Sequence, residues 1–213
     1  MKTKSIILVG MSNVGKSYWR EKLSALGFEP FWCDDKIEAK LGPFLKKNGY
    51  RGIEDVARWM GQPYESKSKK NCALYLAEEV TVMEEAIRAL KISNKPLVID
   101  TTGSVIYIDE KILRELKRLG TIVMLDAPES LQKDLYQKYL TNPKPVIWGG
   151  NVFKPIAKEN PKETLARCYP ILLKNRNEKY RKLAHVVLDY KELHLPDFTA
   201  NKFLKKIADR DFL

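Results

Sequence analysis

The residues best suited to chemistry begin with a glycine-rich loop near the start of the chain. Gly10 is followed, after four residues, by the run Gly15-Lys16-Ser17. This spacing is typical of a phosphate-binding loop, in which backbone N–H groups at a helix N-terminus and one lysine surround nucleotide phosphates. Lys16 then acts on the transferred phosphoryl group, and the Ser17 hydroxyl is a ligand for Mg2+. We expect the phosphates of ATP or GTP to contact the following residues: Gly10, Ser12, Asn13, Val14, Gly15, Lys16, Ser17 and Tyr18.

Two aspartates end apolar runs, and both suit phosphoryl transfer. Asp34 ends the run 28–34 and has the chemistry to take the proton of an acceptor hydroxyl. A carboxylate that caps a helix is the alternative interpretation. Asp100 ends the run 96–100 and is placed to order Mg2+ through water, with an Asx turn as the alternative. We assign Asp34 to catalysis and acceptor binding, and Asp100 with Ser17 to the metal.

A long segment between two helical patterns carries further candidates. Residues 141–163 contain four prolines and two glycines together with Trp148 and Phe153, and we interpret them as a lid. Lys144 in this lid is placed to neutralise charge on the transferring phosphoryl group, or else it is a solvated lysine. On charge alone, Arg176 is a surface residue. His185 and His194 have no partner pattern for catalysis or metal binding, and we assign them no role.

The elements that must position these residues alternate along the chain. Five apolar runs are typical of buried parallel strands, and helical patterns separate them. We expect strands at 5–10, 28–34, 96–100, 121–126 and 185–189, and helices at 16–26, 74–90, 109–119, 128–140 and 163–183. This order predicts a three-layer α/β/α fold with a five-stranded parallel sheet, in which ligands bind beyond the carboxyl ends of the strands. We expect one P-loop kinase domain over 1–213, with an acceptor-binding subdomain at 35–71 whose helical pieces are short and broken by Gly and Pro.

Composition limits the classes of protein that fit. The chain has 213 residues, of which 44% are hydrophobic and 31% charged, and no apolar run approaches the roughly 20 residues that span a membrane. Its three scattered cysteines suit a reducing cytosol and argue against structural zinc. We therefore expect a cytoplasmic protein that contacts no membrane, and we expect it to be a monomer.

The formal net charge of +11 favours an anionic partner. Residues 154–182 hold nine basic and three acidic side chains, a concentrated excess. This segment is consistent with a wall that faces phosphates, with a nucleic-acid surface, or with a solvated helix face.

Taken in order, these motifs resemble the shikimate kinases, within the nucleoside-monophosphate-kinase-like group of P-loop kinases. The resemblance runs over most of the chain and rests on these segments: "GMSNVGKS", "DDKIEAKLG", "DTTGSV", "LGTIVMLDAP", "KPVI" and Arg176-x-x-x-Tyr180-x-x-x-Ala184. It implies that Asp34 contacts the acceptor hydroxyl and that Gly103 lines the acceptor pocket. It also implies that Arg176 binds an acceptor carboxylate and that Lys144 takes the place of a lid arginine.

Several departures from the family pattern fall in the acceptor half. Trp32 stands where the family has a metal-linked aspartate, so that role passes to Asp100 or lapses. Of three family glycines only Gly103 remains, and Leu76 stands where the family has an arginine that binds the acceptor carboxylate. Arg58, or Arg51, is a candidate to replace that arginine.

These observations favour a kinase that uses ATP and Mg2+ to phosphorylate a hydroxyl of a small carboxylate-bearing metabolite, with shikimate as the leading named acceptor. One alternative is a nucleotide or nucleic-acid 5′-end kinase, which would use the basic segment 154–182. The other is a non-catalytic nucleotide-binding protein that has lost its acceptor site, an interpretation that Trp32 and Leu76 favour.

Overall fold

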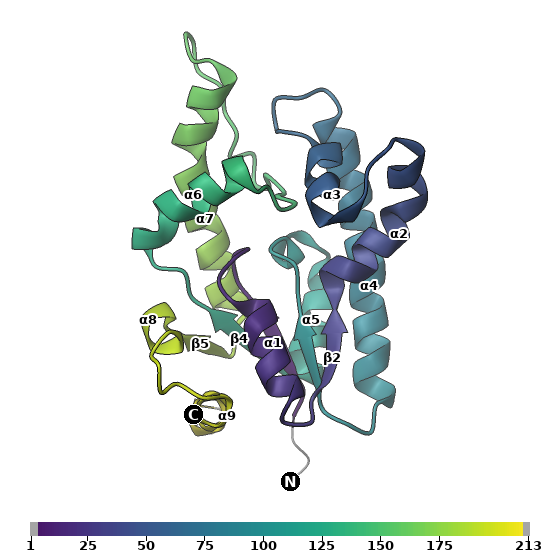
Figure 1. Ribbon diagram of the computed structural model, residues 1–213, viewed down its shortest axis with the longest axis vertical. Coiled ribbons are helices and arrows are strands. Elements are labelled where there is room, and N and C mark those ends of the chain that lie inside the picture. The colour runs from purple at the N-terminus through teal and green to yellow at the C-terminus, as the bar shows by residue number, and fades with distance from the viewer. Residues whose placement is uncertain (1–3, 211–213) are drawn as a thin grey trace.

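The computed structural model describes residues 4–210 and centres on a five-stranded parallel sheet (Figure 1). The strands stand in the order β2-β3-β1-β4-β5. Their bounds are β1 (Ile6–Val9), β2 (Glu29–Trp32), β3 (Leu97–Asp100), β4 (Thr121–Leu125) and β5 (Val186–Leu188). The expected five-stranded parallel sheet is confirmed, and each strand is shorter at one or both ends than the apolar run that predicted it.

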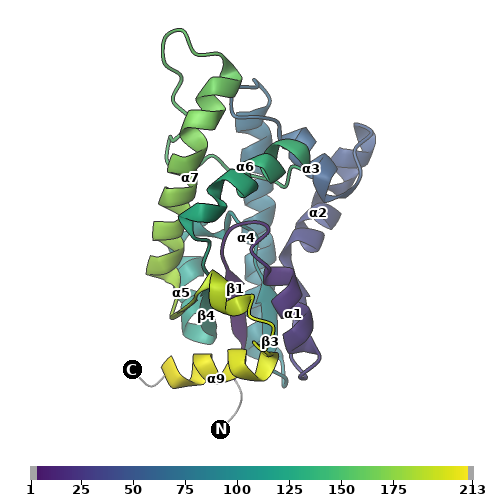
Figure 2. The same cartoon turned by 60° about the vertical axis from the view of Figure 1, so that its left-hand side comes forward.

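Helices cover both faces of this sheet because of the direction in which the chain crosses it. From β1 the chain moves past β3 to β2, whereas every later crossover moves in the opposite direction. Right-handed crossovers therefore place α1 (Lys16–Ser24) on one face. They place α4 (Ser68–Ile92), α5 (Glu110–Leu119) and α7 (Pro161–Leu183) on the other (Figures 1 and 2). The three-layer α/β/α arrangement is confirmed.

The remaining helices are α2 (Cys33–Lys47), α3 (Gly52–Met60), α6 (Gln132–Thr141), α8 (Tyr190–Leu193), α9 (Ala200–Arg210) and the short 3-10 helices η1 (Val105–Tyr107) and η2 (Glu129–Leu131). Of these, α6 corresponds to the helix predicted at 128–140. The expected breaks at Gly and Pro are present after α2 and at Gly61, where α3 ends, but Gly42-Pro43 makes no break, because α2 continues through both residues. Ile37, Leu41 and Leu45 are buried at four-residue spacing on one face of α2, and this burial offsets the roughly 3 kcal/mol that an interior proline costs.

Two other boundaries were wrong. Helix α4 begins at Ser68, six residues before the predicted start, and Asp34 lies in the first turn of α2 and not at the end of a strand. Helix α9 was missed altogether; its Phe203 stacks on Trp19 of α1 with ring centroids 4.7 Å apart, and the Trp19 side chain is buried. Within residues 4–210, none of the helices combines the length and the apolar character needed to cross a membrane.

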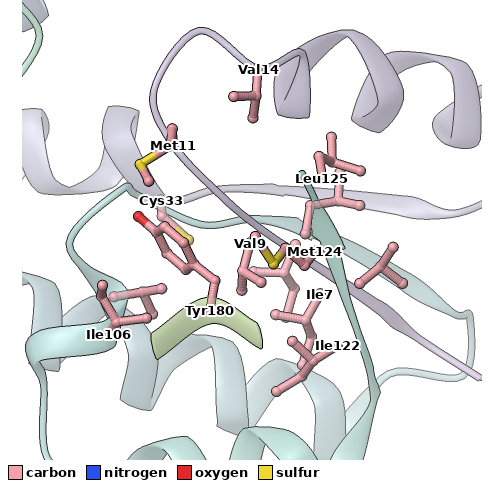
Figure 3. Packing of buried hydrophobic residues seen from close by; sticks show 14 of the residues in the cluster. Ile7, Val9, Met11, Val14, Cys33, Ile106, Ile122, Met124, Leu125 and Tyr180 are labelled. Carbon is pink, nitrogen blue, oxygen red and sulfur yellow. The ribbon is translucent and has the colours of Figure 1, made fainter. Parts of the chain in front are cut away.

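The core lies between the sheet and its helices. Figure 3 shows alternate residues of β1 and β4, among them Ile7, Val9, Ile122 and Met124, packing together near Tyr180 of α7. Strands buried on both faces are expected to be apolar almost throughout, and β1 and β4 are buried at every position and apolar except at Thr121.

The strand register brings the chemical residues to one edge of the sheet. Asp100 of β3 pairs with Leu8 of β1 on one side and with Trp32 of β2 on the other. The loops that follow β1, β2 and β3 therefore leave the sheet side by side. A parallel sheet binds ligands at the crevice where its crossovers change direction, and here that crevice lies beyond β1 and β3.

Candidate active site

The loop between β1 and α1 has the backbone shape of a phosphate cradle. Gly10 has φ +145°, and a Cβ there would lie 2.7 Å from the carbonyl oxygen of Leu125, so a larger residue does not fit. Gly15 has φ +97° and immediately precedes α1, whose first-turn N–H groups have no partners within the helix. Because these N–H groups and the helix dipole favour negative charge, the loop suits a phosphate group.

Lys16 folds back over this loop. Its Nζ donates hydrogen bonds to the carbonyl oxygens of Gly10, at 3.1 Å, and Met11, at 2.9 Å. Burial lowers the pKa of the Lys16 ammonium group, while the nearby carboxylates of Asp100 and Asp34 raise it. The ammonium group is therefore held at the loop by weak carbonyl partners, which an anion can replace.

One cavity of about 280 Å³ joins most of the predicted site residues. Ten of them line it: Ser12, Asn13, Gly15, Lys16, Ser17, Tyr18, Asp34, Asp100, Gly103 and Lys144. Four do not: Gly10, Val14, Arg58 and Arg176. Seven lining residues were not among the predicted site residues: Arg20, Trp32, Cys33, Asp35, Glu38, Tyr75 and Pro145. Residues from the loop after β1, from the ends of β2 and β3 and from the lid thus face one space.

Asp34 has the altered acidity expected of a catalytic base. Its side chain has solvent-accessible surface toward the cavity, yet protein surrounds it closely, and this burial raises the pKa of the carboxyl group to about 6. The positive charges of Lys16 and Lys144 oppose that rise, and the charge of Asp100 adds to it. None of the ion pairs within residues 4–210 involves Asp34, so its carboxyl oxygens are available to a ligand.

Asp100 already has a cationic partner. Nη1 of Arg20 lies 2.9 Å from Oδ2 of Asp100, and both side chains are largely buried. The same guanidinium group lies 5.5 Å from the centre of the Trp32 ring. Sequence reasoning missed Arg20, although its position four residues after Lys16 places it on the same side of α1. Any metal ion at Asp100 therefore shares the carboxylate with Arg20.

A buried glutamate supports the loop after β3. Glu79 of α4 is fully buried and accepts hydrogen bonds from the hydroxyls of Thr102 and Ser104, the latter at 2.7 Å. Burial raises the pKa of Glu79 to about 7, although these hydrogen bonds lower it. Between the two hydroxyl residues, Gly103 is confined: a Cβ would lie 3.2 Å from Oγ of Ser12 and 3.3 Å from Nη1 of Arg176. The sequence contained one sign of this support: Glu79 stands among apolar residues on the buried face of a long predicted helix.

The two arginines predicted to bind an acceptor carboxylate lie outside the cavity. Arg58 is 67% exposed in its side chain and pairs with Asp55 one turn away on α3. Arg176 is 3% exposed and donates from Nη2 to the carbonyl oxygen of Ile147 at 2.7 Å. It lines a separate cavity of about 20 Å³, room for roughly one water molecule.

The lid segment crosses from α6 toward α3 (Figure 1). Nε1 of Trp148 donates to the hydroxyl of Tyr139 at 3.2 Å, and that hydroxyl donates in turn to Gln62, just beyond α3. Phe153 also approaches Tyr64, with ring centroids 6.3 Å apart. These aromatic contacts join the lid to the region that carries α2 and α3, and they place Lys144 in the cavity between the two sides.

The basic segment 154–182 covers the end of the lid and most of α7. Arg167 pairs with Glu159 at 2.6 Å, and Arg181 pairs with Asp126 at 2.5 Å. Within the described part of the chain, six lysines of this segment form no ion pair and do not line the cavity of about 280 Å³: Lys154, Lys158, Lys162, Lys174, Lys179 and Lys182. A nucleic-acid partner for this segment stays a prediction.

Comparison with solved structures agrees with this geometry. A shikimate kinase from Aquifex aeolicus superimposes with a TM-score of 0.60 at 20% identity, over 97% of this chain and 98% of that one. A shikimate kinase from Acinetobacter baumannii in complex with shikimate gives 0.56 at 23% identity, over 98% and 93%. The chain has a shikimate kinase-like P-loop kinase fold.

This fold is shared with kinases named for other substrates. A dephospho-CoA kinase from Campylobacter jejuni gives a TM-score of 0.50 at 15% identity, over 97% of this chain and 94% of that one. No protein-family model matches the chain, and no curated protein matches it by sequence. The fold is therefore established by structure, while the acceptor has to be argued from the site itself.

Proposed function

We propose that this protein is an ATP-dependent kinase that transfers the γ-phosphoryl group to a hydroxyl of a small molecule. The observation that carries this proposal is the single cavity in which the phosphate cradle and Lys16 face Asp34. Phosphoryl transfer to a hydroxyl needs a site that binds the phosphates and a base near the hydroxyl, and the Asp34 carboxyl group, with a pKa of about 6, suits the second role.

The residues present fit Mg-ATP. The cradle at Gly10 excludes a Cβ, and the α1 N-terminus with Lys16 supplies positive charge for the phosphates. Ser17 and Asp100 line the same cavity and offer the oxygen ligands that Mg2+ prefers. Ser17 and Asp100 would hold Mg2+, which would supply positive charge to the phosphates, and Arg20 already occupies one oxygen of Asp100.

In this proposal each side chain at the cavity has a separate role in phosphoryl transfer. Asp34 accepts the proton of the acceptor hydroxyl and holds that oxygen toward the phosphate cradle. Lys16 and Lys144 approach from the loop and the lid, so positive charge stands on two sides of the transferred group. Gly103 leaves room for the acceptor where a side chain would press on Ser12 and Arg176.

Shikimate is the first acceptor to test, because the sequence resemblance and the similarity to shikimate kinases point to it. An acceptor carboxylate needs a cation in the cavity. Besides Lys16, the described residues that line the cavity include two, Arg20 and Lys144, and we assign the carboxylate contact to these.

The test is an ATP-consumption screen over shikimate, other hydroxy acids, neutral sugars, nucleosides and oligonucleotides with a 5′-hydroxyl. Turnover of a small hydroxyl compound that is lost in Asp34→Asn would support the proposal. Turnover of oligonucleotides alone, with a steep dependence on salt, would favour the 5′-end kinase. Binding of ATP without turnover of any acceptor would favour the non-catalytic interpretation.

A further inference from the structure

We propose that Arg176 and the ring of Tyr107 hold the lid closed over the cavity, and that Gly149 is the point at which the lid meets this support. Arg176 is then a positioning residue that acts through the lid and Lys144. The link to catalysis rests on the function proposed above, but the closing contact itself does not.

The first observation concerns the hydrogen bonds of Arg176. Arg176 is 3% exposed, and among the residues that the structure describes its Nε has no hydrogen-bond partner. None of the ion pairs within the described part of the chain supplies it with a carboxylate. Its Nη2 donates to the backbone oxygen of Ile147, a buried lid residue. Because an unpaired buried charge is costly, this carbonyl is a partner that Arg176 loses when the lid opens.

The second observation concerns the space around Gly149. A Cβ on Gly149 would lie 2.4 Å from Cε1 of Tyr107 and 2.7 Å from two more ring atoms. Gly149 is not among the glycines with positive φ, so close approach to the ring is what requires glycine here. The lid backbone therefore rests directly on the face or edge of an aromatic ring, and any side chain pushes it away.

The third observation is that the ring of Tyr107 is itself fixed. The guanidinium carbon of Arg176 lies 5.6 Å from the ring centre, and Nζ of Lys179 lies 4.9 Å from it. Two cations of α7 thus hold the ring by cation–π attraction. Within residues 4–210 the Tyr107 hydroxyl has no hydrogen-bond partner, and the atoms nearest to Gly149 are ring atoms, so we assign the support of the lid to the ring.

These contacts limit where Lys144 can lie. Ile147 is three residues after Lys144, and Gly149 is five residues after it. Three residues span at most roughly 10 Å, so a lid fixed at Ile147 and Gly149 keeps the backbone of Lys144 within roughly that distance of Ile147, near the cavity that Lys144 lines. Release of Arg176 or displacement of Gly149 removes that limit without altering the phosphate cradle.

Hydrogen–deuterium exchange of the full chain, without nucleotide, tests the proposal. We expect Gly149→Ala to raise the exchange rate of the Trp148 indole N–H, which donates to the Tyr139 hydroxyl, by at least about tenfold, with the backbone amides of β1 and β4 unchanged. Tyr107→Ala should do the same, whereas Tyr107→Phe, which keeps the ring, should exchange like the natural protein. Ile156→Ala, an exposed lid residue, is the matched control and should change nothing.

A double variant separates the contact from a general loss of structure. Gly149→Ala with Tyr107→Ala disrupts the same contact from both sides, so its exchange should be no faster than that of the faster single variant. Unchanged exchange in Gly149→Ala, or additive acceleration in the double variant, would overturn the proposal. Should Gly149→Ala fail to fold, Tyr107→Ala decides: unchanged lid exchange in that variant would overturn it equally.

Calorimetric titration with Mg-ATP keeps this result apart from the proposed function. We expect Gly149→Ala to bind Mg-ATP within about threefold of the natural protein, because its cradle is untouched. A loss of affinity of tenfold or more would contradict a role confined to the lid. Failure of the natural protein to bind Mg-ATP would count against the kinase and leave the exchange result standing.

Discussion

The two ends of the cavity are built in different ways. The nucleotide end comes from one contiguous stretch, in which Gly10 and Gly15 adopt backbone shapes that other residues avoid. The acceptor end is assembled from three distant parts of the chain: Asp34 of α2, Gly103 after β3 and Lys144 of the lid. A contiguous motif carries its own geometry, whereas a dispersed site depends on how separate elements pack.

The departures from the shikimate kinase pattern fall on the dispersed end for this reason. Trp32 remains 40% exposed at the cavity and lies near Arg20, while Leu76 packs against the core and does not line the cavity. Neither replacement disturbs the backbone of the phosphate loop. The nucleotide end can therefore persist while the acceptor end changes its substrate.

The largest effect is expected at Asp34. Asp34→Asn should lower turnover by roughly two to four orders of magnitude, because the amide cannot accept the hydroxyl proton, with nucleotide affinity retained. In the natural protein, turnover should fall as pH drops through about 6, since a protonated Asp34 is no base. Steady-state kinetics from pH 5 to 8 measures both.

Asp35→Asn is the matched control, because it removes one charge from the same turn of α2. It should lower turnover far less and leave the pH profile in place. An Asp34→Asn variant with full activity would show that the acceptor end works without this base.

The next effect concerns the support beneath the acceptor end. Burial raises the pKa of Glu79 from 4.5 to about 7, so the folded state binds its proton more tightly than the unfolded state. Stability should therefore fall as pH rises from about 4.5 to 7, by on the order of 3 kcal/mol from this group. Urea unfolding at pH 5 and pH 8 should show that Glu79→Gln loses most of this pH dependence.

Glu78→Gln, one residue earlier on α4, serves as the control and should keep the pH dependence of the natural protein. Equal pH dependence of stability in both variants would contradict a buried Glu79 with a raised pKa. It would also count against the interpretation that Glu79 supports the loop around Gly103.

The smallest effect is expected at Arg58. The Arg58 side chain is 67% exposed and does not line the cavity, so Arg58→Ala should change the KM for the acceptor less than about threefold. An increase of tenfold or more would show that Arg58 reaches the acceptor, as the sequence comparison predicted, and would place the acceptor end closer to α3 than the cavity does. Lys69→Ala, on the neighbouring helix α4, is the control.

The sequence predicted the sheet and the phosphate loop because both follow local rules. Buried parallel strands are apolar throughout, and the glycines of the loop mark their own backbone shapes. It missed the continuous α2, because the buried face of Ile37, Leu41 and Leu45 overrides the local effect of Pro43. Arg20, Glu79 and the support of the lid by Tyr107 depend on contacts between distant residues, which spacing alone does not encode.

The central claim is that the loop from Gly10 to Ser17 binds the phosphates of ATP through Lys16. Calorimetric titration of Mg-ATP into the natural protein, Lys16→Ala and Lys22→Ala tests it most directly, since Lys22 lies on the same helix away from the cradle. The account predicts binding by the natural protein and Lys22→Ala, and no measurable binding by Lys16→Ala. Equal affinity of Lys16→Ala and the natural protein would contradict it.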